Sequence, residues 1–306
     1  MSYRLSTSGG DAPAWCGPSI ASASWSAVVR AILITALAVI MTACTSSDVL
    51  RSTAQPIPTS ASSKYAAIVV DAGTDRVLHA DQADSRRYPA SLTKMMTVYM
   101  LFEALQQGRI GTSTEIPISA YAASRPPTKL HFKAGQTIDV DTAIRSLVTR
   151  SANDVATAVA EHLGGTEANF AAMMTARARQ LGMGSTVFRN ASGLPDAGQV
   201  STARDMATLS LALRRNFPAQ YGYFGRTSFA FRGKTIKGHN KVLETVRGAD
   251  GIKTGYTRAS GFNLATSVRR DGRSIVAVVM GGDSAAQRDA LMAQLIETFL
   301  PKASRR

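Results

Sequence analysis

The order of strand-like and helix-like segments in this 306-residue chain predicts an α/β fold of the α+β type, in which helices flank an antiparallel sheet. Strand patterns lie at both ends of the region 66–280, whereas its middle, roughly 115–215, is dominated by helical patterns. The dipeptide Asp271-Gly272 between two strand patterns predicts a hairpin, which joins adjacent antiparallel strands. We therefore expect one sheet with a helical subdomain inserted between its strands.

The first expected elements are a hairpin and a buried helix. Ala66–Val70 has the apolar pattern of a short strand, and Arg76–His79 is the returning strand after the turn residues 71–75. Ser91–Gln107 is apolar on nearly every side, which is typical of a buried helix, and Gly108 is expected to end it.

The middle of the chain predicts three more helices. Val140–Leu163 and Glu167–Leu181 have helical patterns that end at glycines. Ser201 and Thr202 precede the third helix, and Asp205 follows at the position of a capping box.

The C-terminal part returns to strands. Phe262–Arg269 and Ser274–Met280 flank Asp271-Gly272, a pair typical of a type I′ turn. Gly281-Gly282 is expected to break the second strand. An amphipathic helix is expected over Ala285–Leu300.

Composition and charge favour a globular protein with an anionic partner. Hydrophobic residues make up 45% of the chain, which is enough for a substantial core, and the net charge is +14. Only Arg4, Arg30 and Asp11 are charged within residues 1–44, so the basicity belongs to the body of the protein. No helix-turn-helix, RNA-binding aromatic motif or zinc module occurs, which argues against nucleic acid as a partner. An anionic cell-envelope surface is the expected partner of this charge.

Residues 1–44 are predicted to be a leader. Arg30 precedes the apolar run Ala31–Ala43, which suits a signal peptide and is short for a membrane span of about 20 residues. The sequence Met41-Thr42-Ala43-Cys44 resembles a bacterial lipoprotein cleavage box, so Cys44 is a candidate lipid anchor. Ordinary signal cleavage and an uncleaved anchor remain alternatives. All three place the body in the periplasm or cell envelope, behind a flexible tether over residues 45–63.

Cysteines and histidines exclude several classes of site. The two cysteines are Cys16 and Cys44, both in the leader, so the body has no disulfide and no cysteine nucleophile. The four histidines are scattered without metal-ligand spacing. We expect neither a metal nor another cofactor. No Gly-x-Ser-x-Gly motif is present.

The first chemical motif is Ser91-Leu92-Thr93-Lys94. Side chains three residues apart on a helix lie on one face, so the Ser91 hydroxyl and the Lys94 amine are within reach of each other. A serine needs a base to become a nucleophile, and a lysine can serve when burial or a nearby cation lowers its pKa. Alone, the motif is in most chance occurrences a capping serine and an exposed lysine.

Two further motifs follow along the chain. Ser151-Ala152-Asn153 lies inside the predicted helix 140–163 and offers a hydroxyl for proton relay and an amide for substrate. Lys253-Thr254-Gly255 precedes the C-terminal strands, where Lys253 supplies positive charge, Thr254 a carboxylate ligand, and Gly255 room for a substrate backbone. Each triplet alone is also explained as helix capping or an exposed turn.

These three motifs in this order are the set found in penicillin-binding proteins and class A β-lactamases. The chain resembles the D-alanyl-D-alanine carboxypeptidase family of low-molecular-weight penicillin-binding proteins over residues 64–300. The resemblance extends to several other segments. They are Pro89–Met95, Ser151–Asp154, Leu181–Met183, Phe188–Leu194, His239-Asn240, Gly251–Thr257 and Ser260–Leu264.

The resemblance implies a β-lactamase/transpeptidase-like fold with a five-stranded antiparallel sheet, and it implies roles for the motif residues. Ser91 would be the acyl-ester nucleophile and Lys94 its proton acceptor. Ser151 and Asn153 would guide proton return and substrate orientation, and Lys253 would lie across the cleft.

The resemblance also implies substrate-binding groups. The backbone N–H groups of Ser91 and Tyr256 would form an oxyanion hole beside Thr254 and Gly255. Arg288 matches an arginine near the terminal carboxylate of the substrate, and a surface salt bridge is its alternative role.

The implied activity is that of a serine-type D-Ala-D-Ala carboxypeptidase. It removes the terminal D-alanine of peptidoglycan stem peptides and is inhibited by β-lactams. A DD-endopeptidase, a serine β-lactamase and a non-catalytic wall-binding module are alternatives. Against the β-lactamase, residues 183–200 offer Asp196 as their one carboxylate and contain no Glu. The family often continues into a second domain and a C-terminal membrane helix, whereas residues 301–306 form a basic tail, so we expect any anchor to be N-terminal.

Overall fold

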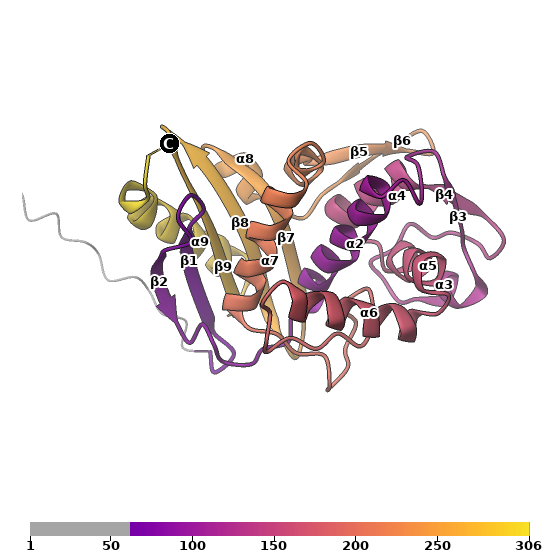
Figure 1. The fold of residues 1–306 in the computed structure, drawn as a ribbon, viewed down its shortest axis with the longest axis horizontal. Coiled ribbons are helices and arrows are strands. Elements are labelled where there is room, and N and C mark those ends of the chain that lie inside the picture. The colour runs from indigo at the N-terminus through magenta and orange to yellow at the C-terminus, as the bar shows by residue number, and fades with distance from the viewer. Residues whose placement is uncertain (1–61, 306) are drawn as a thin grey trace, which may run out of the picture. The chain divides into compact units, whose positions relative to one another are not determined.

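The computed structural model describes residues 62–305, so the predicted leader and the tether up to residue 61 lie outside the described residues. A five-stranded antiparallel sheet carries helices on both faces, and a helical subdomain lies beside it (Figure 1). The predicted fold class is confirmed. Among the helices of residues 62–305, none combines the length and the hydropathy needed to span a bilayer.

The sheet joins strands from both ends of the described chain in the order β2-β1-β9-β8-β7, with all neighbours antiparallel. Its strands are β1 (Ala66–Asp71), β2 (Val77–Asp81), β7 (Ala249–Thr257), β8 (Gly261–Arg270) and β9 (Arg273–Gly282). The strand β7, which carries the Lys-Thr-Gly motif, is therefore an edge strand.

The β8–β9 turn confirms the predicted hairpin. Asp271 and Gly272 have φ angles of 53° and 73°, as both central positions of a type I′ turn require. The expected break at Gly281-Gly282 is wrong, because both glycines belong to β9. The Gly281 N–H donates to the buried Asn263 side chain (2.9 Å), which holds this stretch in the sheet.

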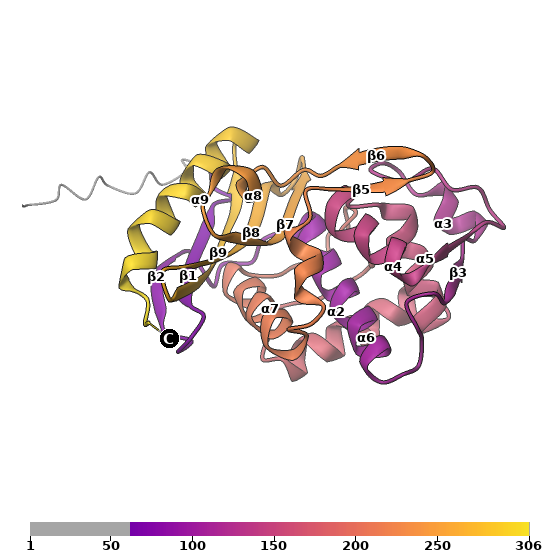
Figure 2. The same ribbon diagram turned by 90° about the horizontal axis from the view of Figure 1, so that it is seen from above.

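The two faces of the sheet bury separate cores, because side chains alternate along each strand. Ile68 and Val278 face the core that includes α7 (Ala203–Asn216). Val69 and Val279 face the core that includes α9 (Ala285–Phe299). Figure 2 shows α7 and α9 on opposite sides of the strands. The Thr202 hydroxyl accepts from Asp205 N (3.0 Å), so the predicted cap of α7 is present.

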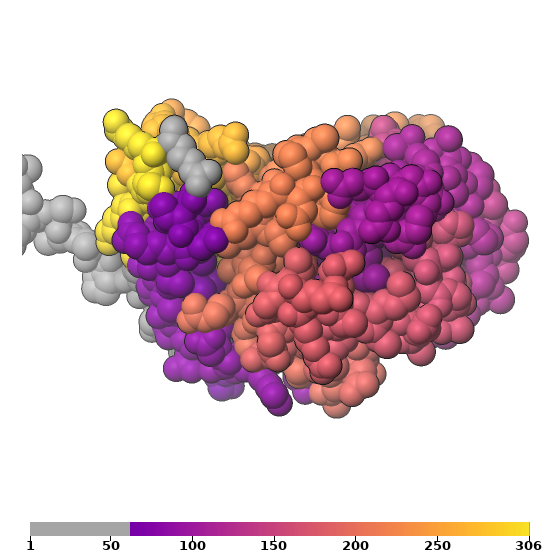
Figure 3. All heavy atoms as spheres, viewed as in Figure 1, coloured from indigo at the N-terminus to yellow at the C-terminus, as the bar shows by residue number. Residues whose placement is uncertain are grey.

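The helical subdomain occupies the middle of the chain, between β2 and α7. Its helices are α2 (Lys94–Gln106), α3 (Ala120–Ser124), α4 (Val140–Arg145), α5 (Asn153–Gly164) and α6 (Glu167–Gln180). The helix α2 is almost wholly buried, as predicted. In the space-filling view, orange atoms in the middle of the molecule lie beside the purple and rose atoms of this subdomain (Figure 3).

Two helix predictions need correction. The segment 91–107 begins as a 3₁₀ turn, η2 (Ala90–Thr93), and only then becomes α2. The segment 140–163 is interrupted: α4 continues as a π-helical turn, η3 (Ser146–Arg150), and ends at Ser151, which has left-handed backbone angles. The break falls in the mostly polar stretch Thr149–Asp154, where the apolar pattern of the predicted helix is interrupted.

Two small hairpins were not predicted. They are β3 (Glu115–Pro117) with β4 (Thr137–Asp139), and β5 (Ser228–Phe231) with β6 (Lys234–Lys237). Strands of this length are too short to show a clear alternation of apolar and polar residues. Short turns complete the described chain: η4 (Tyr221–Gly225), α8 (Val242–Thr245) and η5 (Leu300–Lys302).

Candidate active site

The predicted nucleophile Ser91 lies in the 3₁₀ turn η2, where the backbone is held from both sides. Ala90 just before it has a φ of 47°, an unfavourable angle for an alanine. The buried Asn263 amide donates to the carbonyls of Tyr88 (3.0 Å) and Pro89 (3.1 Å). These bonds tie the residues before Ser91 to the start of β8 and help to fix the turn.

Two glycines allow neighbouring segments to approach η2 closely. A Cβ atom at Gly193 would lie 1.9 Å from the Ala90 carbonyl oxygen, and one at Gly255 would lie 2.9 Å from the Ser91 nitrogen. Gly255 was expected to make room for a substrate backbone. The structure gives it another reason, because the space beside its Cα is filled by the chain's own η2 turn.

Lys94 is fully buried, and three oxygen atoms surround its amine. Its Nζ lies 3.2 Å from Ser91 Oγ, 2.6 Å from Asn153 Oδ1 and 2.5 Å from the Ser192 carbonyl oxygen. Burial, followed by the charge of Lys253, holds the pKa of Lys94 well below its usual value, against the opposing charges of buried Asp154 and Glu167. The structure thus brings together the predicted pair and adds Asn153 to it.

Ser151 and Asn153 are positioned by a break between helices rather than by a continuous helix. Ser151 has φ 64° and ψ 39°, and its buried hydroxyl has no hydrogen-bond partner within the described residues. Asn153 begins α5, and its Nδ2 donates to the Pro126 carbonyl (2.9 Å) while its Oδ1 accepts from Lys94. The Asn153 amide orientation is therefore fixed by one donor and one acceptor.

Lys253 is the second buried lysine of the site. Burial, followed by the charge of Arg288, lowers the pKa of Lys253 to about 7. Its Nζ donates to the Thr254 carbonyl at 2.9 Å. Near neutral pH this amine is therefore only partly protonated, and its charge acts on Lys94 only while the proton is bound.

Tyr256 and Arg288 are placed very differently. Tyr256 follows the motif on β7, is 56% exposed, and stacks its ring on Phe262 with centroids 4.2 Å apart. Arg288 on α9 is 4% exposed, donates to Asp289 (2.7 Å), and lies close enough to Lys253 to influence its pKa. Arg288 does form a salt bridge with Asp289, but the alternative of a surface position is wrong, because the Arg288 side chain is buried.

Sequence reasoning missed the buried carboxylates that fix the segments around Lys94. Buried Glu167 accepts from Ala191 N (3.1 Å) and from the Thr157 hydroxyl (3.1 Å), which fixes the loop that carries the Ser192 carbonyl. Asp154 accepts from Leu130 N (3.0 Å). The segments Ser151–Asp154 and Phe188–Leu194 had been singled out by resemblance, but only the folded chain shows what they contact.

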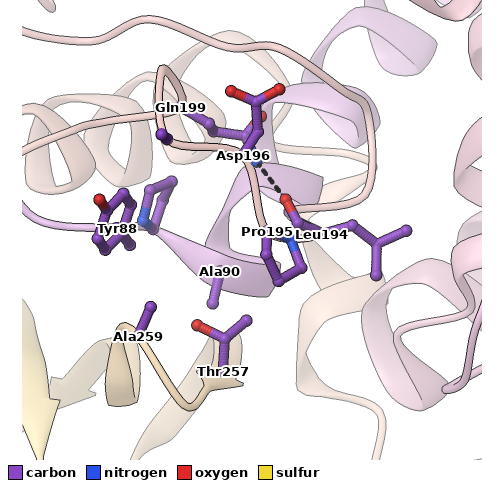
Figure 4. A pocket seen from close by; sticks show the side chains of 11 residues that line it. Tyr88, Ala90, Leu194, Pro195, Asp196, Gln199, Thr257 and Ala259 are labelled. Carbon is purple, nitrogen blue, oxygen red and sulfur yellow. Dashed lines mark hydrogen bonds between the residues drawn. The ribbon is translucent and has the colours of Figure 1, made fainter.

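An apolar cavity of about 170 Å³ adjoins the turn that holds Ser91 (Figure 4). Tyr88 and Ala90 lie on one side of it, Leu194 and Pro195 on another, and Thr257 beyond the end of the Lys-Thr-Gly motif. Within residues 62–305 no cluster of His, Cys, Asp or Glu has the arrangement of a metal site.

Comparison with known proteins shows which family this chain is similar to. The sequence profile of peptidase family S11, described as D-alanyl-D-alanine carboxypeptidase, matches residues 51–284. The D-alanyl-D-alanine carboxypeptidase DacA of Escherichia coli (strain K12) is 34% identical over 236 residues, 75% of this chain and 59% of that protein. The chain thus spans less than two thirds of that relative.

Solved structures show the same fold. Penicillin-binding protein 5 of Haemophilus influenzae is 30% identical with a TM-score of 0.75, covering 79% of this chain and 71% of that one. Penicillin-binding protein D2 of Listeria monocytogenes, in its cefotaxime-bound form, is 28% identical with a TM-score of 0.67, covering 76% of this chain and 95% of that one. By its sequence profile, supported by these likenesses, the chain belongs to the D-alanyl-D-alanine carboxypeptidase family.

Proposed function

We propose that this protein is a serine-type D-Ala-D-Ala carboxypeptidase that removes the terminal D-alanine of peptidoglycan stem peptides. The observation that carries this proposal is the surroundings of the Lys94 amine. Asn153 Oδ1 and the Ser192 carbonyl can only accept hydrogen bonds, and they take up two N–H groups of a neutral amine. The remaining lone pair then faces Ser91 Oγ at 3.2 Å, where it can receive the hydroxyl proton.

The reaction proceeds in two acyl transfers. Ser91 Oγ attacks the carbonyl carbon between the two D-alanines while its proton passes to Lys94 Nζ. The C–N bond breaks, the leaving nitrogen takes a proton, and D-alanine departs. Water then attacks the ester on Ser91, and hydrolysis returns the proton to the serine oxygen.

The other predicted residues receive roles around this step. The free hydroxyl of Ser151 relays the proton to the leaving nitrogen, and Asn153 orients both Lys94 and the substrate. The N–H groups of Ser91 and Tyr256 stabilise the oxyanion. This assignment is supported by the contact of β7 with η2 at Gly255.

The terminal carboxylate of the substrate would meet the cations Lys253 on β7 and Arg288 on α9. Lys253 and Arg288 are buried close together, and Thr254 beside them is also buried. A carboxylate gains most from a cation where water is excluded. These three residues are therefore assigned to binding the carboxylate.

β-Lactams are expected to acylate Ser91 and to leave slowly. Support comes from the cefotaxime-bound and ampicillin-bound structures of Listeria penicillin-binding protein D2. A serine β-lactamase is disfavoured because Asp196, the one carboxylate in residues 183–200, is exposed and accepts from Gly198 N (2.8 Å). The DD-endopeptidase alternative uses the same chemistry on a cross-linked substrate.

The cell envelope is the proposed location. Peptidoglycan as substrate, a basic surface and an apolar leader all support it. Attachment through a lipid on Cys44 and contact with an anionic envelope surface are part of this proposal.

Labelling by a fluorescent penicillin tests the proposal. The purified full chain should incorporate one label per molecule, Ser91→Ala should incorporate none, and Lys94→Ala should label about 10³-fold more slowly. D-alanine release from a muramyl pentapeptide should follow the same order, and slow penicillin turnover should exclude a β-lactamase. Absence of both labelling and D-alanine release from a folded wild type would refute the proposal.

A further inference from the structure

A basic recess of about 540 Å³ lies between the loop that follows α3 and the β5–β6 hairpin. Six basic side chains line it, and none of its lining residues is acidic. The six are Lys129, His131, Arg150, Arg232, Lys234 and Lys237. We call the cavity that they line the basic recess.

The absence of acids extends to the two segments that supply every lining residue except Arg150. Residues 116–138 and 217–243 contain no Asp or Glu, although they carry many Lys and Arg. The nearby carboxylate of Asp154 is buried and is bound by the backbone N–H groups of Leu130 and Phe132. Most surface lysines have acids nearby, so a concave surface with cations alone favours an anionic ligand.

The walls of the basic recess are tied together. The ring of Phe231, which lines the recess, lies 5.5 Å from that of Phe132, and the Arg232 guanidinium lies over both rings. Arg232 also donates to Gln136 (3.0 Å), and Lys129 donates to the Ala123 carbonyl (3.0 Å). The cations are therefore presented by a formed recess.

The basic recess is connected to the catalytic residues through Arg150 and Lys129. Arg150 immediately precedes Ser151, and the Thr128 hydroxyl, beside Lys129, donates to the Ser151 carbonyl (2.9 Å). On the other wall, His239 lies within electrostatic range of both Arg150 and Lys253. A substrate chain in the cleft can continue along this series of cations without crossing an acidic side chain of the recess.

We propose that the basic recess binds carboxylate groups of an acidic stem peptide that extends out of the cleft. This inference rests on the proposed function and adds a binding site for the part of the substrate that precedes D-alanyl-D-alanine. A concave recess near the catalytic residues suits a peptide that extends from them, whereas membrane-surface binding typically uses an amphipathic helix or a cluster of basic residues beside a membrane helix.

A matched pair of variants tests this proposal in the full chain. Lys234→Gln with Lys237→Gln removes two charges from exposed residues of the basic recess. Arg179→Gln with Arg269→Gln removes two charges from exposed residues outside it and controls for net charge. Thermal melting and far-UV circular dichroism establish that both variants fold.

The substrates are two peptides ending in D-Ala-D-Ala, one with two glutamate residues upstream and one with glutamines in their place. The wild type should have a lower KM for D-alanine release from the acidic peptide. The recess variant should lose about five- to tenfold of this preference, and the control variant should keep it. Equal KM values for both peptides in the wild type, or equal loss in both variants, would overturn the proposal.

Binding of the two peptides to the Ser91→Ala variant separates the carboxypeptidase proposal from the proposal for the basic recess. If neither peptide is cleaved by the wild type but the acidic one binds Ser91→Ala more tightly, the basic recess is supported and the carboxypeptidase fails. If both are cleaved without preference, the carboxypeptidase stands and the recess proposal fails. Co-sedimentation with phosphatidylglycerol vesicles that only the recess variant loses, without a peptide preference, would assign the surface to a membrane and overturn the proposal.

Discussion

The two walls of the catalytic cleft are built on different principles. The β7 wall is regular: Lys253, Thr254 and Gly255 pair in register with Ala265, Leu264 and Asn263 of β8. The helical wall is irregular, because it places Ser151 at left-handed backbone angles between two helices.

This difference separates what each wall contributes. Regular pairing fixes backbone groups, so β7 can present N–H groups at set positions whatever its exposed side chains are. The helical wall instead works through side chains, and their positions depend on buried hydrogen bonds such as those of Asn153 and Glu167. The turn η2 with Ser91 is held between the two, against Gly193 on one side and Gly255 on the other.

The largest effect on stability and on acylation is expected when Gly193 or Gly255 is replaced by alanine. Gly193→Ala would place a Cβ 1.9 Å from the Ala90 carbonyl at a φ of 83°, so it should cost about 3 kcal/mol or more of unfolding free energy. Penicillin acylation should fall at least about 100-fold, since Ser91 must move. Gly255→Ala, with a 2.9 Å contact, should have the smaller effect.

Gly184→Ala is the matched control, because nothing lies within 4 Å of its Cβ position. Chemical denaturation and labelling rates measure the three variants. A Gly193→Ala protein as stable and as active as the control would show that the helical wall does not hold η2.

An intermediate effect is expected when the pH changes the protonation of Lys253, whose pKa is about 7. The affected quantity is the affinity for a peptide substrate. In a Ser91→Ala background, a D-alanyl-D-alanine peptide should bind about tenfold more weakly at pH 9 than at pH 6, because the ammonium loses its proton. Lys253→Arg should bind with little change, since a guanidinium stays protonated. The pKa of His239, which desolvation and then the charges of Lys253 and Arg150 lower to about 4, lies below this window.

The same shift affects stability. The unfolded chain has the ordinary lysine pKa of 10.5, so between pH 7 and 10.5 it binds a proton that folded Lys253 has released. The unfolding free energy should therefore rise with pH across this window, and Lys253→Met should reduce the rise. Calorimetry of peptide binding and denaturation at several pH values measure both effects. Peptide affinity that does not change with pH would contradict the assignment of Lys253.

The smallest effect is expected at Tyr256. Its side chain is 56% exposed and stacks on Phe262, while its proposed role belongs to its backbone N–H. Tyr256→Ala should change the acylation rate by less than about threefold, because the pairing of β7 is retained. Stopped-flow labelling measures this rate. A loss of 100-fold or more would mean that the β7 wall also acts through a side chain.

The sequence by itself determined the features that depend on local pattern. The type I′ turn at Asp271-Gly272 follows from the ability of these residues to adopt positive φ angles. The bounds of α6 and α9 follow from apolar periodicity and their end signals, to within a residue. The three motifs identified Ser91, Lys94 and Lys253, whose surroundings support the proposed chemistry.

Only the tertiary structure decided how these residues act. The left-handed break at Ser151 and the loop that brings the Ser192 carbonyl to Lys94 depend on contacts between residues far apart in the chain. The same holds for Gly255. It must lack a side chain because η2 occupies the space that a Cβ atom would fill. A pKa shift such as that of Lys94 requires burial and neighbouring charges, and both exist only after the two walls have packed around it.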